Sequence, residues 1–204
     1  LDEDLGRGDI TSTACIAAEI RGSADFMSRE ALVLCGLPLA KEVFLQVDPE
    51  PRFEVFAYEG ERCEANTKIA SVSGAARSIL MGERTALNFL QRLSGVATLT
   101  ARYAAEVAGL PVKLLDTRKT TPGWRLLEKH AVRMGGGHNH RMGLHDGILI
   151  KDNHLAALKE LSRARQVEEA VRSARAMFPG SSAEVEVDTL EQLDAALAVR
   201  PDII

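Results

Sequence analysis

The chain has 204 residues, of which 46% are hydrophobic and 26% are charged, and its formal net charge is −4. This is the composition of an ordinary globular protein, and it excludes a disordered chain. The acidic balance gives no general attraction to nucleic acid or to an anionic membrane, so we expect neither as a partner. No run approaches the ~18 apolar residues of a membrane-spanning helix. A site that binds anions must therefore be confined to one part of the chain.

The three cysteines, Cys15, Cys35 and Cys63, are widely spaced and form no C-x-x-C pair. This pattern favours reduced thiols in a cytoplasmic protein over a disulfide framework.

The first part of the chain alternates strand-like and helical segments. A glycine-punctuated loop precedes Ser12, and Asp9 or Thr11 is a candidate cap for the turn that follows. Strand-like runs at 24–34 and 52–57 flank a short helix at 39–46, and a further strand ends at Gly74. We predict an N-terminal α+β domain over residues 1–90.

The rest of the chain is predicted to be α/β. Apolar residues recur at helical spacing from 78 to 107, and Gly95 predicts a break between two helices there. The following predicted elements are a strand at 112–116, a helix at 128–134, a strand at 147–151, a helix at 156–178, a strand at 183–188, a helix at 190–199 and a strand from 202. Polar residues follow the strand ends, which is typical of parallel α/β folds. Because no Gly-x-Gly-x-x-Gly follows a strand, we favour an incomplete parallel α/β barrel over residues 91–204 and not an open doubly wound sheet.

Positive charge is concentrated in one window of the sequence. All five histidines fall within residues 130–154, and residues 113–154 hold eight Lys or Arg against four acids. The window therefore carries +4 and the remainder of the chain −8. A local positive patch on an acidic protein attracts an anionic ligand.

Three features favour an anion site over a solvated basic face. Thr117, Arg118 and Lys119 directly follow a predicted strand, where parallel sheets present ligand-binding loops. Three glycines precede His138, and we expect them to let backbone N–H groups approach an oxyanion. Lys151 ends an apolar strand, which would fix its position.

Other interpretations of the same residues remain open at this point. His138 and His140 have a spacing that can bind zinc, but the adjacent Arg141 would repel the cation and no cysteine lies nearby. Glu184 and Glu186 share one face of a strand, where either could bind a ribose diol or magnesium, or both could be edge-strand charges. Arg84 alone resembles a surface residue at a helix start.

Several motifs in a fixed order resemble a known family. They are EDLGRGDITS at 3–12, GERTALNFLQRLSGVAT at 82–98, DTRKTTPG at 116–123, GGGHNHR at 135–141, IKDNH at 150–154 and EVEVD at 184–188. Together they span essentially the whole chain and are similar to the quinolinate phosphoribosyltransferase family. The resemblance implies a dimer with an α+β domain and an incomplete α/β barrel. It also implies a reaction: quinolinate and 5-phosphoribosyl 1-diphosphate give nicotinate mononucleotide, CO2 and pyrophosphate with Mg²⁺.

The resemblance also implies roles for individual residues. Arg118, His140, Arg141 and Lys151 match the residues that hold the pyridine dicarboxylate. Arg84 matches an arginine that enters the neighbouring subunit's site, which replaces its interpretation as a surface residue. Thr117 and Lys119 match a loop that contacts the substrate and the pyrophosphate of the donor, and Glu186 matches the acid near the ribose and the magnesium ion. Arg118, Lys119, Lys151 and Glu186 are therefore the expected catalytic residues.

Two departures limit this resemblance. The chain begins without Met and stops where a strand would begin, whereas the family continues with a second acid and glycine-rich phosphate loops, so we expect a truncated chain. Two rival functions follow: a related pyrophosphorylase-like transferase with another substrate, and a non-catalytic anion-binding module. The complete set of cationic residues favours a dicarboxylate acceptor over the first rival.

Overall fold

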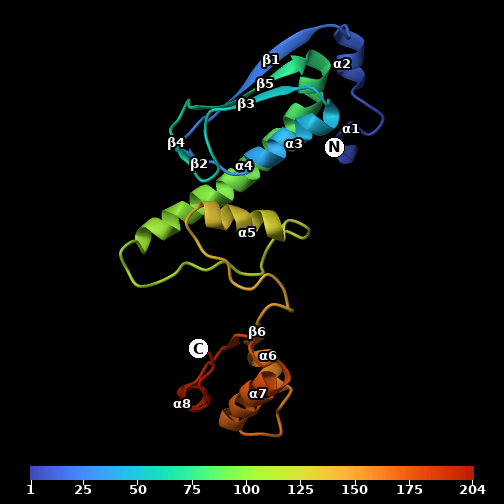
Figure 1. Ribbon diagram of the computed structural model, residues 1–204. Helices are drawn as coiled ribbons and strands as arrows, with labels where there is room; N and C mark the ends of the chain where they lie inside the picture. Colours follow the sequence, from blue (N-terminus) through green and yellow to red (C-terminus); the bar gives the residue numbers. More distant parts are fainter. The chain divides into compact units, whose positions relative to one another are not determined.

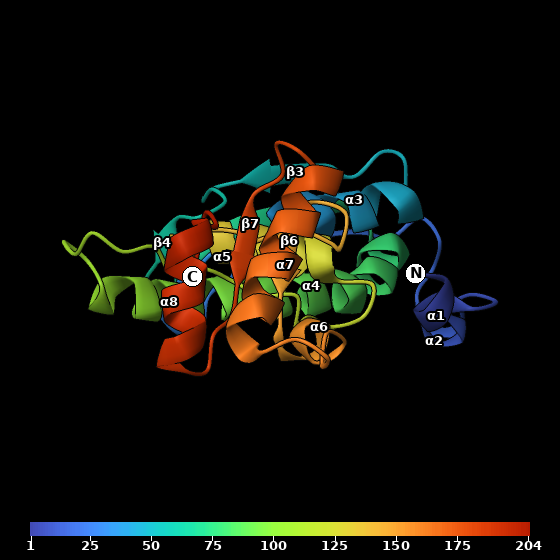
Figure 2. The same ribbon diagram turned by 90° about the horizontal axis from the view of Figure 1, so that it is seen from below.

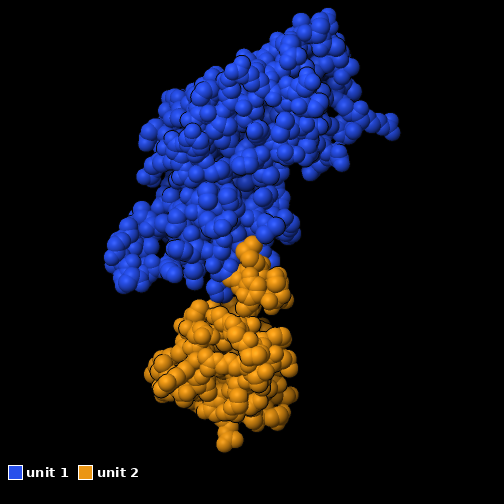
Figure 3. Space-filling view, viewed as in Figure 1, with its two compact units in different colours: residues 1–140 blue, residues 141–204 orange.

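The computed structural model describes all residues, 1–204, and they form two compact units, residues 1–140 and residues 141–204 (Figure 3). Each unit has its own hydrophobic core. No helix in either unit combines the length and the apolar character needed to cross a membrane.

Unit 1 carries the N-terminal elements (Figure 1). In chain order they are α1 (Asp2–Leu5), α2 (Ile10–Cys15), β1 (Arg21–Met27), β2 (Leu32–Val33), α3 (Leu37–Val47), β3 (Arg52–Val55), β4 (Arg62–Cys63), β5 (Lys68–Ala75), α4 (Ala76–Glu106) and α5 (Arg125–Met134). Asp9 caps α2 as predicted, because its carboxylate accepts the Ser12 N–H at 2.9 Å. The predicted strand 24–34 is wrong as one element, since Ser28 turns the chain by bonding to Glu64 and Thr67 and so separates β1 from β2.

A three-stranded antiparallel sheet of order β1-β5-β3 packs on α3 and α4. Its centre is Val72, which pairs with Ala24 on one side and Phe53 on the other. The rings of Phe26, Phe44 and Phe53 meet with centroids about 6 Å apart, joining β1, α3 and β3. This core confirms the predicted N-terminal α+β part.

The 31-residue helix α4 connects this core to α5. The predicted break at Gly95 is wrong, because the helix runs through it without interruption. Gly95 lies on the exposed face, while its neighbours Leu93, Ser94 and Ala97 are buried. Packing on that buried face outweighs the ~1 kcal/mol that glycine costs within a helix.

Unit 2 is α/β (Figure 2). Its elements are β6 (Ile148–Ile150), α6 (Asp152–Ala156), α7 (Arg163–Met177), β7 (Ala183–Val185) and α8 (Leu190–Val199). The strands β6 and β7 pair in parallel, and α7 packs against both of them and against α8. The core contains Ile150, Val167, Val171 and Val185. This arrangement confirms the predicted α/β class, while closure into a barrel stays a prediction.

Two predicted elements of the α/β part are wrong in detail. The helix expected at 156–178 begins only at Arg163, as α7, because residues 157–160 form a turn after α6 ends at Ala156. The strand expected at 112–116 is reduced to one parallel bridge between Leu115 and His138. The predicted domain boundary at 90/91 falls within α4 and stays a prediction.

Candidate active site

The loop after Asp116 presents three of the predicted site residues. Thr117 Oγ1 accepts the backbone N–H of Lys119 at 3.1 Å, which closes a tight turn, and both side chains are exposed. Arg118 between them is half-buried, and its Nε is a buried donor with no hydrogen-bond partner. An unsatisfied buried donor costs ~1–3 kcal/mol, more when charged, so it needs an explanation. An anionic ligand that accepts from Arg118 supplies one.

The same loop is anchored through Glu128 of α5. The Glu128 carboxylate accepts the Thr121 N–H at 3.1 Å, the Thr121 hydroxyl at 2.8 Å and Arg92 Nη2 at 2.7 Å. Burial opposes ionisation of Glu128, but the hydrogen bonds from Arg92 and Thr121 prevail and lower its pKa. The carboxylate thus fixes the loop in its ionised form.

This anchor predicts a pH dependence of stability. A lowered folded-state pKa means that the unfolded chain binds more protons in acid, so the contribution of Glu128 is present above pH 4.5 and is lost as pH falls through the folded pKa. Glu128→Gln should therefore destabilise strongly at neutral pH and less in acid, as measured by urea unfolding. The exposed Glu106→Gln is the control. An equal loss of unfolding free energy at both pH values would contradict the conclusion that the ionised Glu128 carboxylate stabilises the loop.

A buried ion pair between Asp116 and Lys129 holds the segment that carries His140. The two side chains are 7% and 1% exposed. Lys129 Nζ donates to Asp116 and, at 2.9 Å, to the carbonyl of His140, while the His140 N–H donates to Asp116 Oδ1 at 2.9 Å. Asn139 Nδ2 completes the cluster by donating to Asp116 at 2.6 Å and to the Lys129 carbonyl at 2.9 Å. The backbone of His140 is therefore fixed on both sides.

The three glycines before His138 have a different role from the one predicted. The N–H groups of Gly135, Gly136 and Gly137 donate to backbone carbonyls of α5 at 3.0 Å, so none is available to an oxyanion in this conformation. A Cβ on Gly135 would lie 2.3 Å from the Ala97 carbonyl oxygen, and one on Gly137 would lie 2.7 Å from Val132. Close packing at the end of α5 requires glycine at 135 and 137, and the positive φ of +84° favours glycine at 136.

In unit 2, Lys151 and Glu186 meet just beyond the ends of β6 and β7. Lys151 Nζ lies 2.5 Å from Glu186 Oε1, and the Glu186 N–H donates to the Ile150 carbonyl at 2.9 Å. The side chains of Lys151 and Glu186 are 43% and 47% exposed, so the pair contributes little to stability. Arg141 is half-buried and donates to the Gly147 carbonyl at 3.0 Å. Both charges of the pair are accessible to a ligand at the carboxyl ends of parallel strands.

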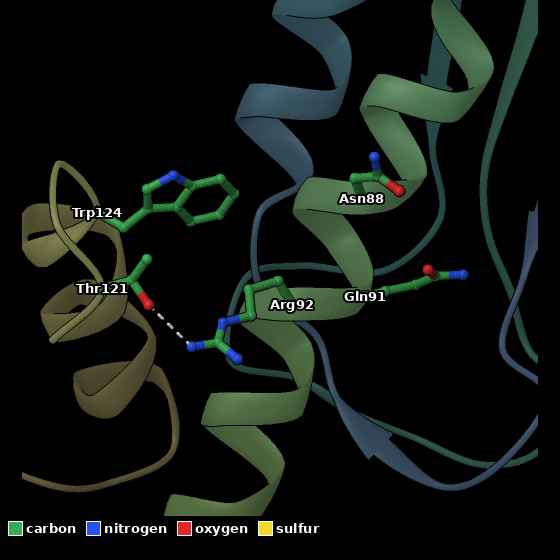
Figure 4. A pocket seen from close by; sticks show the side chains of 5 residues that line it. All are labelled: Asn88, Gln91, Arg92, Thr121 and Trp124. Atoms are coloured by element: carbon green, nitrogen blue, oxygen red, sulfur yellow. Dashed lines mark hydrogen bonds between the residues drawn. The ribbon is translucent and has the colours of Figure 1, made fainter.

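Arg84 lies on an exposed face of α4 that also lines a cavity. Asn88 and Gln91 follow it on the same face at helical spacing, and with Arg92, Thr121 and Trp124 they line an open pocket of about 580 Å³ (Figure 4). Trp124 stacks on Phe89 with ring centroids 5.2 Å apart. Sequence patterns did not indicate this cavity, because its residues come from a helix and a loop that are distant in the chain.

The predicted site residues are thus distributed over both units. Unit 1 holds Arg84, Thr117, Arg118, Lys119 and His140, and unit 2 holds Arg141, Lys151 and Glu186. The structure brings Thr117, Arg118 and Lys119 into one turn and Lys151 and Glu186 into one ion pair. The structural roles of Asp116, Lys129 and Glu128 were not predicted, because in the sequence these residues appear only as charges.

Comparison with known proteins gives a consistent result. Profiles of the quinolinate phosphoribosyl transferase N-terminal and C-terminal domains match residues 9–94 and 96–204. A probable nicotinate-nucleotide pyrophosphorylase (carboxylating) of Synechocystis sp. is 43% identical over 205 residues, which cover 100% of this chain and 67% of that protein. The nicotinate-nucleotide pyrophosphorylase (carboxylating) of Mycobacterium leprae is also 43% identical, with 100% and 71% covered.

Solved structures agree with these matches. NadC from Streptococcus pyogenes superposes with a TM-score of 0.90 at 39% identity, covering 97% of this chain and 68% of its own. The nicotinate-nucleotide pyrophosphorylase of Francisella tularensis gives 0.89 at 40% identity, with 98% and 68% covered. The chain spans about two thirds of the length of these proteins.

Proposed function

Because the chain belongs to the quinolinate phosphoribosyl transferase family, we propose that it makes nicotinate mononucleotide, CO2 and pyrophosphate from quinolinate and 5-phosphoribosyl 1-diphosphate. In this role it is a decarboxylating pentosyltransferase of NAD biosynthesis, and we place it in the cytoplasm. The observation that carries the proposal is the buried, unpartnered Nε of Arg118 in a segment of +4 charge.

The proposed acceptor explains the cationic residues. Quinolinate has two adjacent carboxylates, and a guanidinium binds a carboxylate through two parallel N–H···O bonds. Arg118 has an unused Nε donor, and Arg141 donates one hydrogen bond, through Nη1, to a backbone carbonyl. With His140 and Lys151 these residues would neutralise and orient the dianion. Thr117 and Lys119, exposed on the same turn as Arg118, would contact the pyrophosphate of the donor.

Glu186 fits a magnesium role. Mg²⁺ in nucleotide enzymes is held by one or two carboxylates together with substrate phosphates, and the Glu186 carboxylate is half exposed at a strand end. When bound there, the ion would neutralise charge on the departing pyrophosphate. Lys151, which contacts Glu186 and is part-exposed, would bind a carboxylate of the acceptor.

The reaction needs no side-chain nucleophile. The ring nitrogen of quinolinate forms a bond to ribose C1 while the C1–O bond to pyrophosphate breaks. The resulting pyridinium accepts the electron pair when the C2 carboxylate leaves as CO2, and C2 then takes a proton. Much of the rate enhancement would come from holding two mutually repelling anions in line and from cations placed where charge develops.

The choice of acceptor tests this function against its rivals. The protein, the ribosyl donor and Mg²⁺ are incubated with quinolinate or with nicotinate, which lacks the C2 carboxylate, and nucleotide formation is measured. We expect product from quinolinate and little from nicotinate. Preference for another acceptor would favour a related transferase, and binding of quinolinate without turnover would favour an anion-binding module.

We also propose a homodimer in which Arg84 enters the partner subunit's site. Its exposed position on α4, beside an open pocket, supports an intersubunit role. Mixing inactive Arg84→Ala with inactive Arg118→Ala should restore about a quarter of the wild-type activity, because half of the re-formed dimers are mixed and each has one intact site. If the mixture is no more active than its parents, Arg84 does not act across subunits.

A further inference from the structure

A cysteine, a glutamate and a histidine meet in unit 1 at a place that the proposed reaction does not use. Cys35 follows β2, Glu59 lies in the turn after β3, and His130 lies on α5. Each offers one ligand atom, and these three atoms lie within 4.8 Å of one another. The sequence analysis treated Cys35 only as a reduced thiol and His130 only as part of the basic window.

We propose that Cys35, Glu59 and His130 bind a borderline-soft divalent cation of the Zn²⁺ type. A thiolate, an imidazole and a carboxylate are the three protein ligand types that zinc uses, and three of them leave a fourth position for water. Thiolate and carboxylate together carry −2, so the bound ion makes the site electrically neutral.

The backbone around the ligands is already fixed. The Ser94 hydroxyl accepts the Cys35 N–H at 3.0 Å and donates to the Cys35 carbonyl at 3.1 Å. The Gly60 N–H donates to the Leu34 carbonyl at 2.8 Å, which ties the Glu59 turn to the cysteine segment. Glu59 Oε1 accepts the Leu37 N–H at 2.7 Å, so its second oxygen points toward the other ligands. Binding of the cation would therefore require little further ordering of the backbone.

Protons occupy the place that the cation would take. His130 Nε2 lies 3.1 Å from Glu59 Oε2, close to the ~3.2–3.7 Å between ligands in a tetrahedral zinc site. Burial, with the nearby Glu59 carboxylate, raises the pKa of the Cys35 thiol to about 12. The cation would displace the thiol proton to solvent, and coordination through Nε2 would place the single imidazole proton on Nδ1.

The site is also accessible. Cys35 is fully buried, but the side chains of Glu59 and His130 are 22% and 37% exposed, so an ion can enter from their side. Arg133 Nη2 lies 3.4 Å from His130 Nδ1. Coordination through Nε2 leaves Nδ1 protonated, so Arg133 would turn further into solvent, where it already lies.

Cobalt substitution tests the proposal, because Co²⁺ bound to a thiolate gives a charge-transfer band and tetrahedral Co²⁺ gives intense visible bands. Chelator-treated wild-type protein should develop both with one Co²⁺ per chain, and Zn²⁺ should abolish them. Cys35→Ser should lose the charge-transfer band. His130→Gln, at a part-exposed position, should fold normally and bind Co²⁺ at least about tenfold more weakly.

The other two cysteines supply matched controls. Cys63→Ser removes a buried thiol outside the cluster and Cys15→Ser an exposed one, and both should keep the wild-type spectrum. The proposal is overturned if wild-type protein shows no thiolate band, if the band survives in Cys35→Ser, or if His130→Gln binds with unchanged affinity.

Discussion

Lys129→Met is expected to lower the free energy of unfolding by about 3–5 kcal/mol, because it leaves the buried Asp116 carboxylate without its counter-charge. The His140 carbonyl loses its hydrogen bond from Lys129 at the same time. Chemical unfolding at neutral pH measures the change. The affinity for quinolinate should also fall, since the backbone of His140 is no longer held on both sides.

Lys68→Met is the matched control for this prediction. Lys68 also pairs with an aspartate, Asp25 at 2.8 Å, but the two side chains are 41% and 46% exposed. Exposed ion pairs contribute ~1 kcal/mol or less, and the exposed cation–π contact of Lys68 Nζ with Phe56, which the variant also loses, contributes ~0.5–1 kcal/mol. Equal losses in the two variants would show that burial of the Asp116–Lys129 pair is not what holds the segment.

Arg118→Ala is expected to reduce kcat/KM by at least about 25-fold while leaving the unfolding free energy unchanged or slightly raised. Removing one partner of a desolvated charge pair costs ~2–5 kcal/mol of binding energy, and each 1.4 kcal/mol is about tenfold. The folded protein loses no hydrogen bond at Nε, because that donor has no partner in the unliganded chain. Steady-state kinetics and thermal unfolding of the same preparation measure the two effects.

Two further variants separate geometry from charge. Arg118→Lys keeps the charge but not the planar fork, so it should recover only part of the loss. Lys113→Ala removes one exposed positive charge from the same window and should be close to wild type. If Lys113→Ala lowers kcat/KM as much as Arg118→Ala, the basic segment acts through general electrostatic attraction of anions and not through a specific contact of Arg118.

Sequence patterns predicted the secondary structure best where local periodicity and packing agree. The short helix α3, the strand β6 and the helix α8 appear close to where they were predicted, because each has a single buried face. The break predicted at Gly95 is absent because tertiary packing of the neighbouring residues keeps α4 continuous. The helix predicted at 156–178 was placed to begin too early, because apolar spacing continues across the turn before α7, which backbone hydrogen bonds from Leu158 and Leu161 define.

The structure brings some of the predicted site residues together, while their roles stay predictions. Patterns indicated the charged loop at 117–119 and Lys151, because polar residues that directly follow apolar strands are visible in a sequence. Glu186 was expected within a strand, and its role in the site came from the family resemblance. They did not show that Asp116 and Lys129 are buried together, since an acid and a lysine thirteen positions apart carry no signal of a shared interior site. The glycines at 135–137 were assigned to ligand binding, because close backbone packing and ligand binding both favour glycine and cannot be distinguished in a sequence.

Release of CO2 tests the central claim most directly. Quinolinate labelled at the C2 carboxylate is incubated with the protein, 5-phosphoribosyl 1-diphosphate and Mg²⁺, and labelled CO2 and pyrophosphate are counted together. We predict equal amounts of the two, with both lost in Arg118→Ala and retained in Lys113→Ala. Pyrophosphate without labelled CO2, or neither product from a protein that binds both substrates, would contradict a decarboxylating phosphoribosyl transfer at this site.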